Sequence, residues 1–161
     1  MRRIHAVESH DAGTPEDSVR LDHDQRTRRR MVYTTEAGRS ILLDMMRPVR
    51  LKDGDLLRIE DGSLVRVDAT DEALIEIHAH STAELVRIAW HLGNRHLPTQ
   101  LLPGPDGGVI RIRQDHVIAE MVLGLGGHCQ AVLAPFDPEG GAYEGANEGG
   151  GHHHHHEHEH G

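Results

Sequence analysis

The fold class is decided by the stretch Ser81-Thr-Ala-Glu-Leu-Val-Arg-Ile-Ala-Trp-His-Leu-Gly93, where strand-like patterning gives way to helical periodicity. Ser81 and Glu84 form the pattern of a capping box, in which the hydroxyl accepts a backbone N–H bond and the carboxylate reaches back to the helix start. Gly93 suits the left-handed residue at which such a helix stops. The stretch therefore predicts an amphipathic helix, whose apolar stripe consists of Leu85, Ile88, Ala89 and Leu92.

The residues after this helix continue the alternation of strands and helices. The expected elements are an extended segment, a turn, a strand, a helix and a last strand, at residues 99–102, 103–108, 109–113, 117–123 and 128–133. The second helix is expected to start near Asp115, whose carboxylate suits an N-cap. With a strand at 74–80, the order is β-α-β-β-α-β, which predicts a ferredoxin-like domain over residues 74–143.

Strand patterns dominate the chain before the first helix. Apolar residues alternate on both sides of Asp61-Gly62 across residues 57–67, which is a strong β-hairpin signal. Residues 11–26 are acidic and loop-like, and are expected to form an exposed excursion. Residues 1–73 are therefore predicted to form a small all-β domain that binds a partner or peptide, and the whole chain is predicted to be an α+β protein.

The chain ends in residues that cannot build a core. A Gly-rich spacer at 145–151 precedes His-His-His-His-His-Glu-His-Glu-His-Gly at 152–161. Neutral imidazole suits nickel, zinc and copper, so residues 144–161 are predicted to be a disordered metal-binding tail. His runs also occur as purification handles, although those are commonly plain six-His runs without this alternation of Glu and His. The tail ligands are His152, His153, His154, His155, His156, His158 and His160.

Composition and charge narrow the function classes. The formal net charge of −9 with neutral histidine argues against a nucleic-acid partner and favours attraction of cations. One basic cluster, Arg26-Thr-Arg-Arg-Arg30, fits a solvated strand or loop face, or alternatively a docking patch for an acidic partner. Cys129 is the only cysteine, which excludes an internal disulfide and a Cys-rich zinc site. With no apolar run of membrane-span length and no signal-peptide core in residues 1–8, a cytoplasmic protein without membrane contact is expected.

The sharpest internal motif is His91-Leu-Gly-Asn-Arg-His96, followed by Pro98. His91 is expected in the last turn of the first helix, where a histidine also interacts favourably with the helix dipole without any ligand role. His96 lies beyond the glycine, on irregular backbone from which a side chain projects into an open site. Spacing alone leaves both readings of His96 open, a metal ligand or a structural histidine.

These residues resemble the urease accessory protein UreE family, the nickel metallochaperones of urease maturation. The resemblance covers most of the chain and rests on Gly93-Asn-Arg-His96, Asp115-His116-Val117, Phe136 with Glu139, and the His-rich tail. It implies an N-terminal β domain and a ferredoxin-like domain that forms a homodimer, with one nickel ion bound between the two copies of His96. It also implies delivery of Ni(II) to the apo-urease activation complex, together with the urease accessory GTPase.

One part of the family pattern is incomplete here. Some members carry a His-x-His pair just before the second helix, and the matching positions are Gln114 and His116. Only the second histidine of the pair is present, so the resemblance does not by itself imply an intact second internal site. His116 remains a candidate ligand at the interface, or alternatively a polar residue in the first helical turn.

Three further histidines have weaker patterns. His78 and His80 would lie on one face of a strand, a spacing that suits either a shared metal or a solvated strand face. His128 and Cys129 would point to opposite faces of the last strand, and Cys129 is expected to act as a small buried hydrophobic residue. No catalytic motif is found in the sequence, so an enzyme is not expected.

The sequence-based hypothesis is a carrier that holds Ni(II) as cargo, with Zn(II) and Cu(II) as competitors. A sparse site with two imidazoles leaves positions for incoming ligands, whereas a closed cage of four protein ligands would retain its ion. Two other hypotheses remain open. One is a cytoplasmic nickel or zinc buffer that relies on the tail, and the other is an interaction scaffold whose histidines are incidental.

Overall fold

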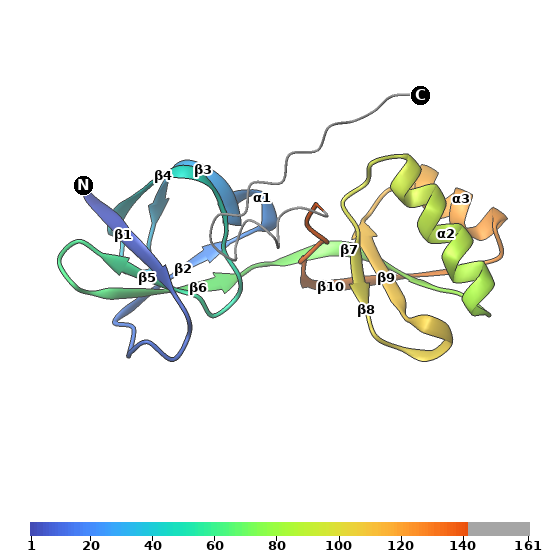
Figure 1. Cartoon of the computed structure of the whole chain (residues 1–161), viewed down its shortest axis with the longest axis horizontal. Coiled ribbons are helices and arrows are strands. Elements are labelled where there is room, and N and C mark those ends of the chain that lie inside the picture. The colour runs from blue at the N-terminus through green and yellow to red at the C-terminus, as the bar shows by residue number, and fades with distance from the viewer. Residues whose placement is uncertain (142–161) are drawn as a thin grey trace, which may run out of the picture.

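The computed structural model describes residues 1–141, and Figure 1 shows them as two sheet-based units joined in series. The N-terminal unit is a six-stranded sheet in the order β2-β6-β5-β1-β4-β3. Its core consists of aliphatic side chains and Tyr33. Its elements are β1 (Arg2–Glu8), β2 (Asp17–Leu21), α1 (His23–Arg26), β3 (Thr27–Thr34), β4 (Ser40–Arg50), β5 (Leu56–Ile59) and β6 (Leu64–Ala69).

The predicted hairpin at Asp61-Gly62 is confirmed. β5 and β6 pair antiparallel, with Leu57 opposite Val65. Gly62 has φ 90°, a backbone conformation that glycine adopts without steric cost. Asp61 Oδ1 accepts a hydrogen bond from the Ser63 N–H at 2.9 Å, which is the local bond that an aspartate typically makes in a turn.

The prediction of an exposed excursion at residues 11–26 is wrong. The second half of this segment forms β2 and the single turn α1, and Val19, Leu21 and Arg26 are buried. β2 pairs parallel with β6, which places Val19 opposite Val67 in the core. One of the acidic residues that suggested a loop is a helix cap, because the Asp22 side chain accepts from the Gln25 N–H at the start of α1. The N-terminal unit is therefore a β domain with one helical turn.

The C-terminal unit has the predicted β-α-β-β-α-β order of elements. Its four-stranded antiparallel sheet has the order β10-β7-β9-β8. In Figure 1 both long helices cover the same face of this sheet. The buried contact between helices and sheet is aliphatic, with Ile77, Ile88 and Leu92 fully buried. The elements are β7 (Asp71–His78), α2 (Thr82–Asn94), β8 (Gln100–Leu102), η1 (Pro105–Gly107), β9 (Val109–Arg113), α3 (His116–Gly124) and β10 (His128–Pro135).

The ends of α2 differ in detail from the sequence prediction. The Ser81 hydroxyl accepts from the Glu84 N–H at 3.1 Å as expected, but Glu84 Oε1 accepts from the His80 N–H, one residue earlier than a capping box requires. Gly93 lies inside the helix and is not left-handed; the left-handed residue is His96, with φ 56°. A glycine inside a helix costs only about 1 kcal/mol, which the burial of Leu92 outweighs.

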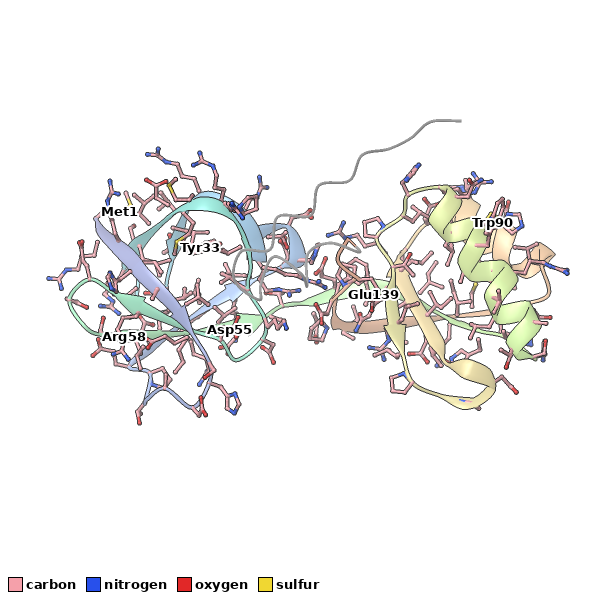
Figure 2. The ribbon with its side chains drawn as sticks, viewed as in Figure 1. Met1, Tyr33, Asp55, Arg58, Trp90 and Glu139 are labelled. Atoms are coloured by element: carbon pink, nitrogen blue, oxygen red, sulfur yellow. The ribbon has the colours of Figure 1, made fainter. Side chains whose placement is uncertain are left out.

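The segment after β10 lies in the seam between the two units. Phe136 is fully buried, and its carbonyl accepts from the guanidinium of Arg26, a buried residue of the N-terminal unit. Asp137 Oδ1 accepts from Arg50, and the Glu139 N–H donates to the Thr99 carbonyl at 2.7 Å. Figure 2 accordingly shows Glu139 between the two units.

The domain boundary and the C-terminal tail were also predicted from the sequence. The predicted domain boundary between residues 73 and 74 falls within β7, and the predicted tail at 144–161 lies outside the described residues. Across residues 1–141, no helix is both long enough and apolar enough to cross a membrane.

Candidate metal centre

His96 occupies a special backbone position just beyond the end of α2. Its N–H donates to the Gly93 carbonyl at 3.0 Å, and the Leu97 N–H donates to the Leu92 carbonyl at 3.4 Å. These two bonds define a Schellman motif, in which the residue at His96's place adopts the left-handed conformation and is usually glycine. Leu92 and Leu97 also pack in the same apolar cluster, as this motif requires.

The second helix of the same unit ends in the same motif with the usual residue. The Gly126 N–H donates to Leu123 O at 3.0 Å, the Gly127 N–H donates to Val122 O at 3.0 Å, and Gly126 has φ 96°. The molecule therefore contains a matched pair of helix ends, one closed by glycine and one by histidine. For a residue with a Cβ atom, the left-handed conformation costs about 1–2 kcal/mol. Conformations of this kind gather at functional sites, where the local structure enforces them.

The histidine at this position is presented to solvent. His96 is exposed, and it follows the C-terminal end of α2, whose unpaired carbonyl groups carry partial negative charge. That end of a helix favours a cation. The side chain of the neighbouring Arg95 extends toward α3, where its Nε donates to Met121 Sδ at 3.1 Å. One exposed imidazole in a cation-favouring environment can act as a metal ligand.

His116 lies at the same end of the helical layer as His96. β7 and β9 run antiparallel, so the helices that follow them start at opposite ends, and α3 begins where α2 finishes. His116 is exposed at the first position of α3, where Asp115 caps the helix by accepting from the Val117 N–H at 3.0 Å. Gln114, in place of a second histidine, is exposed and its N–H donates to the Ala73 carbonyl.

His91 lies in the last turn of α2 as predicted. Its ring lies edge-on to the Trp90 ring, with 5.0 Å between the centroids. Figure 2 shows Trp90 on the helical layer, and 62% of this side chain is exposed. Other exposed apolar side chains on the two helices are Val86, Val117 and Leu123.

Within residues 1–141 no three His, Cys, Asp or Glu side chains converge into a metal-binding group. One chain therefore supplies His96 alone, or His96 with His116 at the same end, and further donors have to come from elsewhere. The tail histidines, from His152 to His160, lie outside the described residues.

The His78–His80 spacing suited either a shared metal or a solvated strand face, and in the structure the two histidines have different partners. His78 Nε2 lies 2.8 Å from Glu76 Oε1, whereas the His80 ring contacts the His128 ring, with 4.7 Å between centroids. Burial alone would raise the pKa of Glu76, but hydrogen bonds from Arg111 and His78 outweigh it and lower the pKa. The contact between His80 and His128 was not predicted, although antiparallel pairing of β7 with β10, the first and last strands of this unit, brings these residues together.

Cys129 faces the helices and is partly buried, whereas a buried hydrophobic residue was predicted. It packs against the apolar cluster between helices and sheet, and its Sγ lies 3.9 Å from the Ala119 carbonyl. Burial raises the pKa of this thiol. Since the thiolate is the form that binds metals, this environment opposes a ligand role for Cys129.

Comparisons with known proteins agree along the whole chain. Residues 1–70 match the N-terminal domain of the UreE urease accessory protein, and residues 72–161 match its C-terminal domain. Proteins named urease accessory protein UreE are similar to this chain in Rhodopseudomonas palustris (strain HaA2), with 54% identity over 136 residues, and in Dechloromonas aromatica (strain RCB), with 47% identity over 138 residues. These alignments cover 84% and 85% of this chain, and 61% and 76% of the relatives. A third relative of the same name, from Chelativorans sp. (strain BNC1), is 41% identical over 145 residues, which is 89% of each protein.

Proposed function

This chain belongs to the UreE family of urease accessory proteins, and on that premise we propose that it carries Ni(II) and donates it during assembly of the urease active site. The chain spans about 61% of the length of the Rhodopseudomonas palustris relative, so its activity is a proposal that goes beyond the family membership. The observation that carries the proposal is His96, an exposed imidazole held in a left-handed conformation where the equivalent helix end has glycine.

The metal site is proposed to form between two copies of the chain. One imidazole cannot hold an ion against water, whereas a two-fold axis beside His96 brings a second, identical imidazole to the same ion. Exposed apolar side chains on the outer faces of α2 and α3 support this arrangement, since Val86 and Trp90 lie one turn apart on α2 and each is 62% exposed. Two imidazoles leave coordination positions open, and open positions let the ion pass to another set of ligands.

The tail and the partners complete the proposed carrier. The histidines at 152–160 are proposed to collect Ni(II), and the Gly-rich spacer at 145–151 precedes them in the chain. The urease accessory GTPase and apo-urease are the proposed recipients in the cytoplasm. Ligand type does not select nickel, because Cu(II) binds imidazole more tightly and Zn(II) comparably, so metal supply and the recipient must select the ion.

The test is urease activation at limiting nickel by the full chain carrying His96→Ala. Loss of activation is expected with the tail intact, because the tail cannot define one coordination geometry. His91→Ala is the matched control, since it removes an imidazole from the same helix end and should leave activation unchanged.

The alternative functions predict different outcomes. A nickel or zinc buffer would be impaired by replacing the tail histidines and indifferent to His96→Ala. A scaffold with incidental histidines would tolerate both changes. Either outcome would overturn the carrier proposal.

A further inference from the structure

His80 and His128 meet near the start of α2, at the opposite end of this helix from His96. β10 pairs antiparallel with β7 in a register that places His128 opposite His78. His80 lies two residues beyond His78, so it is the diagonal neighbour of His128, and continuing the register would place Gly126 directly across from it. Side chains on diagonal neighbours approach closely enough for large groups to touch.

The two rings lie at the separation that a shared metal ion requires. Their centroids are 4.7 Å apart and their planes are inclined by 74°. Two imidazoles bound to one ion, each nitrogen about 2.0–2.1 Å from it, have centroids about 4.5–5.2 Å apart for cis or tetrahedral angles. Both side chains are exposed, so an ion reaches them without any rearrangement of the core.

The surroundings of the pair favour a cation. The Glu84 carboxylate lies beside it, because Oε1 accepts from the His80 N–H at 2.9 Å and Oε2 lies 2.7 Å from the place of a Cβ atom on Gly126. The third histidine of the group is engaged elsewhere, since His78 Nε2 lies 2.8 Å from Glu76 Oε1. The pair thus has two imidazole donors with a carboxylate near them, and no third side-chain ligand among the described residues.

We propose that His80 and His128 form a metal site of their own for a divalent transition-metal ion with a preference for imidazole, such as Cu(II), Ni(II) or Zn(II). The 13 residues of α2 separate this site from His96 by about 20 Å, so one ion cannot bridge the two. Both ligands belong to one chain, and the site therefore needs no dimer. With two protein ligands and water in the remaining positions, it exchanges its ion readily, and each chain has a loading point independent of the His96 pair.

The test uses the full chain with His96→Ala and with Gln in place of every histidine between 152 and 160. This background removes the donors that would mask a weak site. Cu(II) is the probe, because it binds imidazole most tightly of the three metals. Calorimetric titration measures affinity, and electron paramagnetic resonance detects the nitrogen donors. His80→Gln and His128→Gln, each added to the background, are expected to weaken the tightest Cu(II) site at least tenfold.

His78→Gln is the matched control, because it removes an imidazole from the same strand end that is already engaged by Glu76. It should change the Cu(II) affinity less than twofold. Since His80 and His128 are exposed and His78 is only partly buried, melting temperatures should stay near that of the background and show that each variant is folded. Equal affinity in the background and in both single variants would overturn the proposal, and so would an equal loss in His78→Gln. Urease activation is not measured, so this outcome is independent of the delivery role.

Discussion

At the scale of single residues, the conflict between stability and function is concentrated at His96. The left-handed position of the Schellman motif at the end of α2 favours glycine, and the corresponding position at the end of α3 is Gly126. A side chain in that conformation costs free energy that a glycine would not. The chain tolerates the cost at the helix end where His96 is proposed to bind metal, which is the pattern expected for strain retained at a functional position.

His96→Gly should therefore stabilise the C-terminal unit by about 1 kcal/mol and weaken Ni(II) binding at the same time. Chemical denaturation followed by fluorescence measures the first effect, the stability of the C-terminal unit, because Trp90 is the only tryptophan in the chain and lies on α2. Nickel titration of a variant with the tail histidines replaced measures the second.

Gly126→Ala is the reciprocal change for this prediction. It puts a Cβ atom into the left-handed position on α3 and near the flexible end of Glu84, so it should destabilise the same unit by about 1 kcal/mol. If His96→Gly lowers stability while Gly126→Ala also lowers it, the histidine contributes a contact that outweighs its backbone cost, and the strain argument fails.

At the scale of elements, the cap that begins α3 holds the candidate ligand His116 in place. Asp115 accepts from the N–H groups of both Val117 and Ile118, and His116 is the residue between the cap and its partners. Asp115→Ala should cost about 1 kcal/mol and let the first turn of α3 fray. Asp115→Asn should cost much less, since asparagine caps equally well. Trp90 fluorescence during denaturation compares the two, and equal losses would show that the charge matters more than the cap.

The elements that the sequence predicted are those whose signals are local. Helical periodicity with Ser81 as cap, the hairpin at Asp61-Gly62 and the N-cap at Asp115 each involve residues a few positions apart, and the structure agrees at all three. β2 was missed because its five residues carry only two apolar positions, and their burial depends on pairing with β6, far along the chain.

For the candidate site too, the sequence predicted features that depend on nearby residues and not those that depend on distant ones. The positions of His91 and His116 follow from helix boundaries, and the sequence predicted both. The left-handed conformation of His96 was not predicted, because Gly93 was the more natural stop and the helix continues past it to Asn94. The contact between His80 and His128 depends on the register of β7 with β10, which sequence spacing does not contain.

At the scale of the whole molecule, the seam fixes how the N-terminal unit lies relative to the C-terminal unit. Arg26 is 2% exposed, and it donates to the carbonyls of Leu51 and Phe136, which lie before and after the whole C-terminal sheet in the chain. Beside it, the Arg113 guanidinium lies 5.2 Å from the centroid of the Phe136 ring and 3.0 Å from Asp24 Oδ1. A recipient that contacts both units would depend on this arrangement.

Arg26→Met should loosen the seam while keeping most of its packing volume. The two carbonyls lose a charged donor, at a cost of about 1–3 kcal/mol. Because the lost contacts join the two units, the calorimetric unfolding transition should broaden or split into two, with the N-terminal and C-terminal units melting separately. Arg28→Met, at an exposed position two residues away, is the control. A uniform shift of a single transition would mean that the units do not unfold independently.

His23 should make the seam sensitive to acid. Its ring lies edge-on to Phe136 with 5.7 Å between centroids, and burial, followed by the nearby charges of Arg26 and Arg113, lowers its pKa below 6.5 despite the opposing carboxylates of Asp24 and Glu72. Above pH 6.5 the histidine is neutral in both the folded and the unfolded chain, so its contribution to stability is fully present. As the pH falls from 6.5 toward the lowered pKa, the unfolded chain takes up a proton that the folded chain resists, and stability is lost.

His23→Gln removes this proton and keeps a polar side chain of similar length. The difference in unfolding free energy between the original chain and this variant should therefore change with pH only below 6.5, in the direction that favours the variant as the solution is acidified. Denaturation at several pH values between 5 and 8 measures it, and the many exposed histidines cancel in the comparison. A difference that stays constant across that range would show that His23 titrates normally and that the seam excludes water less well than its geometry indicates.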